Sequence, residues 1–196
     1  MKEYVTLPNA LTSGSLAAGF LSILLIFQTN NLLGVAGLVV LAAVFDILDG
    51  PAARRKGTEG EFGTNLDSLA DLVSFGAAPA LALYLSSLYA LPVVGLAACL
   101  VFFLCGAWRL ARFSICKNSL YFVGCPIPIA GVLVALLAVT KPHPLLALPA
   151  VLVLSVLMVC TLPVPTLSGL RNREELSEVV EEYRQTRRDA RDASAG

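Results

Sequence analysis

The sequence predicts an all-α integral membrane protein with six transmembrane helices. Of its 196 residues, 57% are hydrophobic and only 14% are charged, and the mean hydropathy is +0.77. A soluble domain of similar length usually carries about 25% charged residues, so the composition is typical of a membrane protein. The formal net charge is zero, which gives no general attraction to nucleic acid.

Six apolar stretches supply the expected helices, since a membrane-spanning helix needs about 20 mostly apolar residues. They cover approximately residues 9–27, 32–53, 63–88, 91–113, 126–140 and 144–162. The fifth stretch is short, and Pro79 and Pro92 can interrupt the third and fourth. Broken spans, giving seven or eight shorter pieces, are therefore an alternative.

Basic residues between the stretches predict the orientation. One side of the membrane receives Lys2, Arg54, Arg55, Lys56, Arg109, Arg112, Lys117 and the charged tail, whereas the other side receives only Lys141. The positive-inside rule then places both termini in the cytoplasm of a multi-pass protein of the cell membrane. An even number of spans follows, which favours six.

A change of composition divides the chain at about residue 168. We expect residues 1–168 to form the transmembrane domain and residues 169–196 to form a charged cytoplasmic tail. Within the tail, Leu176, Val179, Val180 and Tyr183 recur at helical spacing, which predicts a short surface helix. A solvated face is favoured there over a specific partner site.

Four aspartates lie within or at the cytoplasmic ends of the second and third stretches, where a carboxylate costs about 2.5–3.5 kcal/mol at mid-membrane. Asp46 and Asp49 are three positions apart and Asp67 and Asp71 are four apart, so each pair shares a helix face. The short connection at residues 54–62 makes the two helices antiparallel neighbours. Both pairs can therefore face each other at the cytoplasmic end.

A divalent cation is the simplest compensation for such a cluster. Carboxylates with no His or Cys nearby favour Mg²⁺ or Mn²⁺ over zinc, and two ions about 3.5–4 Å apart would fit. Small residues, among them Gly50, Ala53 and Gly63, flank the aspartates. They admit either a bulky ligand or closely packed helices. Three consecutive basic residues beginning at Arg54 favour a phosphate-bearing ligand.

Residues 46–71 read DILDGPAARRKGTEGEFGTNLDSLAD. This stretch resembles the CDP-alcohol phosphotransferase signature, which marks the class-I type of the CDP-alcohol phosphatidyltransferase family. The pattern is Asp, two residues, Asp-Gly, two residues, Ala-Arg, eight residues, Gly, three residues, Asp, three residues, Asp. Every fixed position is filled, by Asp46, Asp49, Gly50, Ala53, Arg54, Gly63, Asp67 and Asp71. The resemblance implies the CDP-alcohol phosphotransferase fold of six membrane helices, usually as a homodimer.

The resemblance also implies roles for single residues. Asp46, Asp49 and Asp67 would hold the metal ions that bind the pyrophosphate of the CDP-linked donor. Asp71 would contact the second metal ion and act as general base on the acceptor hydroxyl. The expected donor-binding residues are Asn9, Thr12, Asp46, Asp49, Gly50, Ala53, Arg54, Gly63 and Asp67. Asn9 and Thr12 belong to LPNALT, which resembles the opening of the family, with a helix cap as the alternative role for Asn9.

Three further stretches resemble the branch of the family that uses serine as acceptor. They are LDSLADLVSFGAAPA, CGAWRLARFSI and FVGCPIPIAG, at residues 66–80, 105–115 and 122–131. The expected substrates are CDP-diacylglycerol, or its archaeal ether analogue, and L-serine. Arg109 and Arg112 share a helix face and would bind the serine carboxylate or the donor phosphates. The alternative is a pair of anchors that reach the lipid headgroups.

Two other functions remain open at this point. The same chemistry could use glycerol 3-phosphate or an inositol phosphate as acceptor, which would require more cationic contacts. A small cation transporter would place its carboxylates near mid-membrane and in more than one repeat. The clustering of the aspartates at one end, beside arginines, disfavours the transporter.

Overall fold

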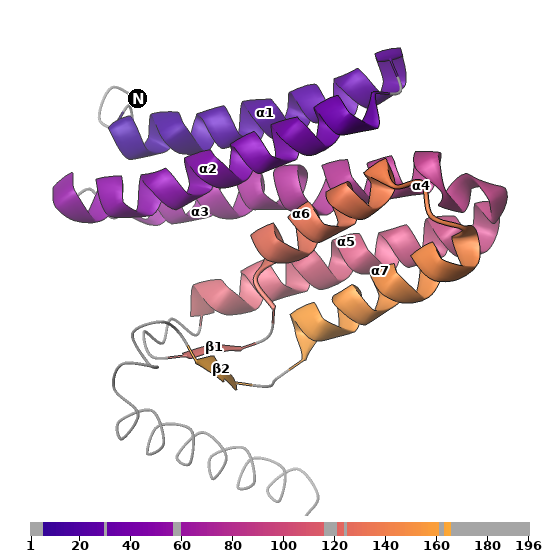
Figure 1. Ribbon diagram of the computed structural model, residues 1–196. Coiled ribbons are helices and arrows are strands. Elements are labelled where there is room, and N and C mark those ends of the chain that lie inside the picture. The colour runs from indigo at the N-terminus through magenta and orange to yellow at the C-terminus, as the bar shows by residue number, and fades with distance from the viewer. Residues whose placement is uncertain are drawn as a thin grey trace, which may run out of the picture.

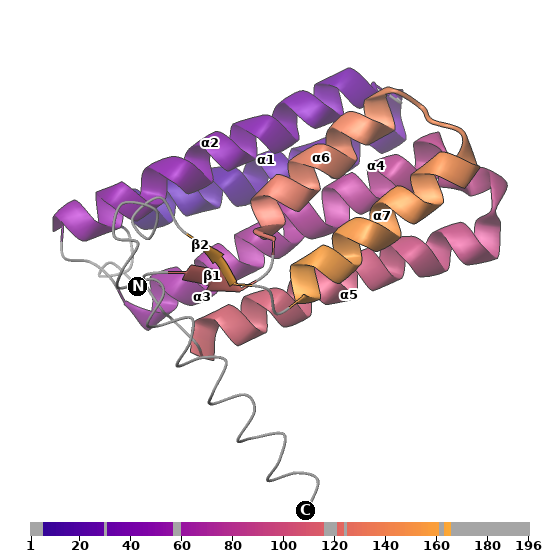
Figure 2. The ribbon, with the colours of Figure 1, turned by 60° about the horizontal axis from the view of Figure 1, so that its bottom comes forward.

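The computed structural model describes residues 6–29, 31–56, 60–115, 121–123, 125–160 and 163–165. These residues form a bundle of helices that run along a roughly common direction (Figures 1 and 2). The α-helices are α1 (Leu7–Thr29), α2 (Leu32–Lys56), α3 (Glu61–Asp71), α4 (Ala78–Ser86), α5 (Pro92–Ile115), α6 (Ile127–Val139) and α7 (Pro144–Val159). The surface helix predicted in the tail lies outside the described residues.

The six predicted spans are confirmed as apolar helices. Four are long enough to cross a membrane: Leu7–Thr29, Leu32–Asp49, Glu61–Ser86 and Pro92–Arg112. The last two, α6 and α7, have only 13 and 16 residues. At 1.5 Å per residue, these two are about 20–24 Å long and shorter than the hydrocarbon layer of about 30 Å. The chain is thus an all-α, multi-pass membrane protein.

Neither proline divides a span into separate pieces. The third span continues from α3 to α4 through η2 (Leu72–Ala77), a π-helical segment in which the N–H of Ala78 bonds to the carbonyl of Val73. Pro79 follows directly, and the wider turn accommodates a residue that cannot donate a backbone hydrogen bond. Pro92 is the first residue of α5, where a missing N–H has no cost. The short 3-10 turn η3 (Leu88–Ala90) precedes it.

The core lies between the helices, and apolar side chains also cover the outside. Phe75 of η2, Leu83 of α4 and Phe102 of α5 are completely buried. Large exposed side chains include Phe20, Leu33, Val93, Leu145 and Val156. Such an outer surface suits contact with lipid, where the helices satisfy their own backbone hydrogen bonds.

A two-stranded antiparallel pair, β1 (Tyr121–Val123) with β2 (Pro163–Pro165), was not predicted from the sequence. Phe122 pairs with Val164 in its centre. The strand β2 reads Pro-Val-Pro, so only its central residue can donate a backbone hydrogen bond. The pair ties the connection between α5 and α6 to the chain after α7, beside the ends of α5 and α7 (Figure 1).

Candidate active site

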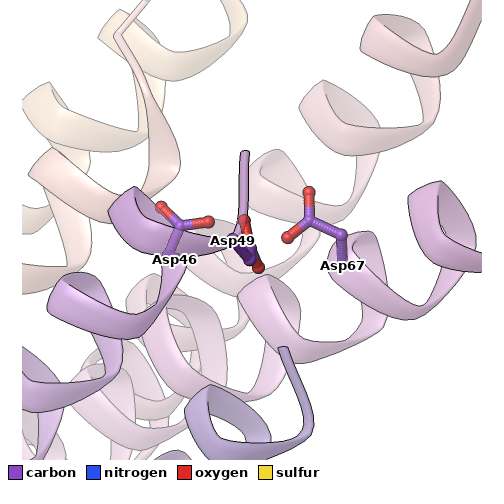
Figure 3. A group of neighbouring side chains, drawn as sticks. All are labelled: Asp46, Asp49 and Asp67. Atoms are coloured by element: carbon purple, nitrogen blue, oxygen red, sulfur yellow. The ribbon is translucent and has the colours of Figure 1, made fainter. Parts of the chain in front are cut away.

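Three of the predicted aspartates meet at the end of the bundle where α2 ends and α3 begins. One carboxylate oxygen from each of Asp46, Asp49 and Asp67 lies within 4.8 Å of the others. Figure 3 shows the carboxyl groups of Asp46 and Asp67 on either side of Asp49. All three side chains are half-buried, so the cluster is both sheltered and accessible.

Three helices position this cluster, because α1 packs against both helices that carry the aspartates. Asp46 and Asp49 reach from α2 toward Asp67 on α3 (Figure 3). The spacing of three on α2 places its two carboxylates on one face. The site therefore includes the first turns of α1, as Asn9 and Thr12 predicted. The helices α2 and α3, predicted to be direct neighbours because of their short connection, instead both pack against α1 and make few close contacts with each other among the described residues.

Asp71 lies one helical turn beyond Asp67 and deeper in the protein. Its side chain is only 7% exposed, and among the described residues its Oδ1 atom has no hydrogen-bond partner. Its carboxyl group interacts electrostatically with those of Asp46, Asp67 and Asp49. Two carboxylates this close repel each other unless a proton or a cation compensates.

A buried arginine faces the same carboxylates. Arg109 on α5 is only 8% exposed and interacts electrostatically with Asp71 and Asp46. A buried guanidinium beside buried carboxylates offsets part of their charge, as burial of ions in proteins requires. Helix α5 thus contributes to the site although it lies far from the aspartates in the sequence.

Arg112 has a different environment from Arg109. Its Nη1 atom donates a hydrogen bond of 3.5 Å to the carbonyl oxygen of Val159, the last residue of α7. Arginine is favourable at such a position, because the final carbonyls of a helix have no partners within the helix. This contact gives Arg112 a role in joining α5 to α7.

The start of α1 closes another side of the cluster. The hydroxyl of Thr12 donates a hydrogen bond of 2.8 Å to Oδ2 of Asp49. A Cβ atom added to Gly63 would lie 3.1 Å from Oδ1 of Asn9, so the Asn9 amide rests against the backbone of α3. The helix-cap alternative for Asn9 is wrong, because Thr6 precedes the helix and its Oγ1 accepts the N–H of Asn9.

Three other predicted residues lie nearby along the chain. Gly50, Ala53 and Arg54 belong to the last two turns of α2, and their expected roles in donor binding stay predictions. One neighbour of the site was missed: Cys125, just before α6, lies within electrostatic range of Arg109. The stretch that contains it was singled out by resemblance, but nothing in the sequence pairs it with α5.

Comparisons with known proteins give a consistent result. The family model for CDP-alcohol phosphatidyltransferase matches residues 5–166. The CDP-diacylglycerol--serine O-phosphatidyltransferase of Bacillus subtilis is 37% identical over 161 residues, which cover 81% of this chain and 89% of that protein. The protein of the same name in Methanocaldococcus jannaschii is 42% identical over 133 residues, or 68% and 57% of the two chains. The archaetidylserine synthase of Methanothermobacter thermautotrophicus is 34% identical over 172 residues, or 86% and 73%.

Proposed function

Because the chain belongs to the CDP-alcohol phosphatidyltransferase family, we propose that it transfers the phosphatidyl group of CDP-diacylglycerol, or of an archaeal ether analogue, to the hydroxyl of L-serine. CMP is the second product. The observation that carries the proposal is the meeting of Asp46, Asp49 and Asp67 beside the buried Asp71. The names of the relatives from bacteria and archaea support serine as the acceptor.

The three clustered aspartates fit a divalent metal ion. Mg²⁺ binds oxygen at about 2.0–2.1 Å, so ligand oxygens around one ion are about 3–4 Å apart, close to the 4.8 Å limit within which these oxygens lie. An all-carboxylate set selects Mg²⁺ or Mn²⁺. We assign Asp46, Asp49 and Asp67 as ligands, with Asp71 next to a second ion. When bound, the ions would neutralise charge on the donor pyrophosphate and on the departing CMP.

Asp71 is the proposed general base. A serine hydroxyl is a poor nucleophile until a base removes its proton. The Asp71 carboxylate takes that proton, the serine oxygen bonds to the phosphorus that carries the lipid, and the bond from this phosphorus to the CMP oxygen breaks. The buried Oδ1 atom of Asp71, which has no hydrogen-bond partner among the described residues, is available to accept the proton.

Arg109 is the proposed site for the serine carboxylate. It is buried and interacts with Asp71, and only two carbons separate the hydroxyl of serine from its carboxyl carbon. A carboxylate held by the guanidinium therefore keeps the hydroxyl near Asp71. Because Arg112 contacts the end of α7, we assign it a supporting role, with the donor phosphates as its proposed ligand.

The beginning of α1 would complete the donor site. Thr12 orients Asp49 through its hydrogen bond, and Asn9 lies against Gly63, where a larger residue would displace its amide. Gly50, Ala53 and Arg54 would accommodate the nucleotide and its phosphates from the end of α2. We propose that this end of the bundle and both termini face the cytoplasm, and that the protein is a homodimer.

The acceptor is tested with purified enzyme, Mg²⁺ or Mn²⁺ and a CDP-activated lipid with either diacyl or ether chains. Each candidate alcohol is added in turn: L-serine, glycerol 3-phosphate and an inositol phosphate. CMP release with serine only is the expected result. Release with glycerol 3-phosphate but not with serine would overturn the assignment, and metal-dependent cation flux in vesicles without CMP release would favour a transporter.

A further inference from the structure

The π-helical segment η2 lies immediately after Asp71, which is the last residue of α3. A π-helical turn contains one more residue than an α-helical turn and changes the phase of the helix that follows. On one side of η2, α3 packs against α1, and on the other side α4 packs against α6. The segment thus lets the acidic face of α3 and the packing face of α4 point to different neighbours.

Helix α1 contacts η2 through a glycine. A Cβ atom added to Gly19 would lie 2.7 Å from Cα of Ser74 and even closer to its Oγ atom, so no larger residue fits without movement of the backbone. The Ser74 hydroxyl donates a 2.9 Å hydrogen bond to the carbonyl of Ser15, one turn earlier on α1. Ser74 is fully buried, so this hydrogen bond is shielded from water.

Helix α6 contacts the next residue of η2 in the same manner. A Cβ atom added to Gly131 would lie 2.5 Å from the carbonyl oxygen of Phe75 and 2.7 Å from its Cα. Pro79, four residues after Phe75, has no N–H to donate to that carbonyl. The π-helical segment is therefore held at two adjacent residues by two different helices.

We propose that Gly19 and Gly131 are positioning residues for Asp71: their lack of side chains lets α1 and α6 hold Leu72–Ala77 in its π-helical form, which fixes the Asp71 carboxyl group beside Asp46. Neither glycine belongs to the signature, and neither touches the carboxylates. The inference rests on the proposed function through Asp71. Glycine at a helix crossing can also serve packing alone, and the experiment separates the two roles.

The test replaces single glycines by alanine in the full-length enzyme in detergent. Gly19→Ala and Gly131→Ala are compared with Gly37→Ala on α2, where an added Cβ atom meets nothing within 4 Å. All three changes add the same methyl group to a helix. We expect Gly37→Ala to match the wild type. In the other two, kcat should fall at least about tenfold with an unchanged KM for the CDP-lipid, because a shift on the order of 1 Å at a reacting group can cost 10²-fold.

Two further variants keep the test informative if an added methyl group prevents folding. Ser74→Ala adds no volume and removes only the hydrogen bond to Ser15, so it should lower kcat with donor KM unchanged. Ser74→Gly removes the side-chain atoms nearest to Gly19. In that background Gly19→Ala should lower kcat less than it does alone, since two residues in contact show a non-additive effect.

Amide hydrogen exchange gives a readout independent of the reaction. Exchange across residues 72–77 should increase in Gly19→Ala and Gly131→Ala but not in Gly37→Ala. If the wild type fails to release CMP with serine, the proposed acceptor is wrong while the exchange data still test the role of the glycines. Equal kcat in all three glycine variants, or a loss explained entirely by less folded enzyme, would overturn the inference.

Discussion

The hydroxyl of Thr12 on α1 donates a 2.8 Å hydrogen bond to Oδ2 of Asp49 on α2. The two residues are 37 positions apart, and Asp49 is the carboxylate that lies between Asp46 and Asp67 (Figure 3). Helix α1 therefore orients the middle member of the acidic cluster. This hydrogen bond restricts rotation of the Asp49 carboxyl group and so fixes the direction of its other oxygen, Oδ1.

Thr12→Val should weaken the metal site without destroying it. A hydrogen bond to a charged group contributes about 1.5–3 kcal/mol, so the Mg²⁺ or Mn²⁺ concentration for half-maximal activity should rise about tenfold or more. Ser13→Ala is the control, since the exposed Ser13 hydroxyl donates its hydrogen bond to the carbonyl of Asn9 within the same helix. An unchanged metal requirement in Thr12→Val would contradict the role given to Thr12.

Asp71→Asn should abolish turnover while the enzyme still binds the CDP-lipid. The change keeps the shape of the side chain but removes its capacity to accept a proton. General-base catalysis contributes about 10²–10⁴-fold, so kcat should fall by that factor. Binding is measured with the CDP-lipid in the presence of metal and no serine. A near-normal kcat would show that another group takes the proton.

Asp67→Asn should mainly lower the affinity for the metal ion, with a smaller effect on kcat at saturating metal. Mutation of a residue that only contacts a metal ligand lowers metal affinity about 10–100-fold. Removal of a ligand itself should therefore lower metal affinity by at least this factor. Activity is titrated with Mn²⁺ and should recover in part at high concentration. Glu61→Gln, an exposed residue in the first turn of the same helix, should leave the titration unchanged.

Asp46→Asn is expected to resemble Asp67→Asn, with one difference. Because Asp46 also interacts electrostatically with Asp71, its neutralisation changes the environment of the proposed base. High Mn²⁺ should therefore restore less of kcat in Asp46→Asn than in Asp67→Asn. Equal recovery in both variants would show that Asp46 acts only as a metal ligand.

Arg109→Lys should raise the KM for serine. Lysine keeps the charge but cannot bind a carboxylate through two parallel hydrogen bonds. Loss of one hydrogen bond to a charged group should raise the KM for serine about tenfold or more. Arg112→Lys is the comparison, and its serine KM should change less because Arg112 contacts the end of α7. The assignment fails if only Arg112→Lys affects serine.

The sequence predicted the helices well because they follow from local composition. The first helix was expected from residue 9 and begins at Leu7, and the second was expected from residue 32 and begins there. The spacing of Asp46 and Asp49 likewise needed only helix geometry. These features depend on residues within a few turns of one another, which a single sequence displays directly.

Features that depend on contacts between distant segments were missed. The strand pair β1–β2 joins two segments about 40 residues apart in register, and nothing in Pro-Val-Pro indicates a strand. Pro79 was considered only as an alternative break in the third span. The π-helical turn before it was missed, because the sequence does not show that Gly19 and Gly131 lie against that turn. The packing of α1 against both α2 and α3 also required the structure.

The most direct measurement is the anomalous scattering of Mn²⁺ bound to crystals of the protein. The account predicts a peak within about 2.2 Å of carboxylate oxygens of Asp46, Asp49 and Asp67, the range typical of hard oxygen ligands, with the Asp71 carboxyl group next to the site. Manganese bound elsewhere, with these three carboxylates directed apart, would contradict it.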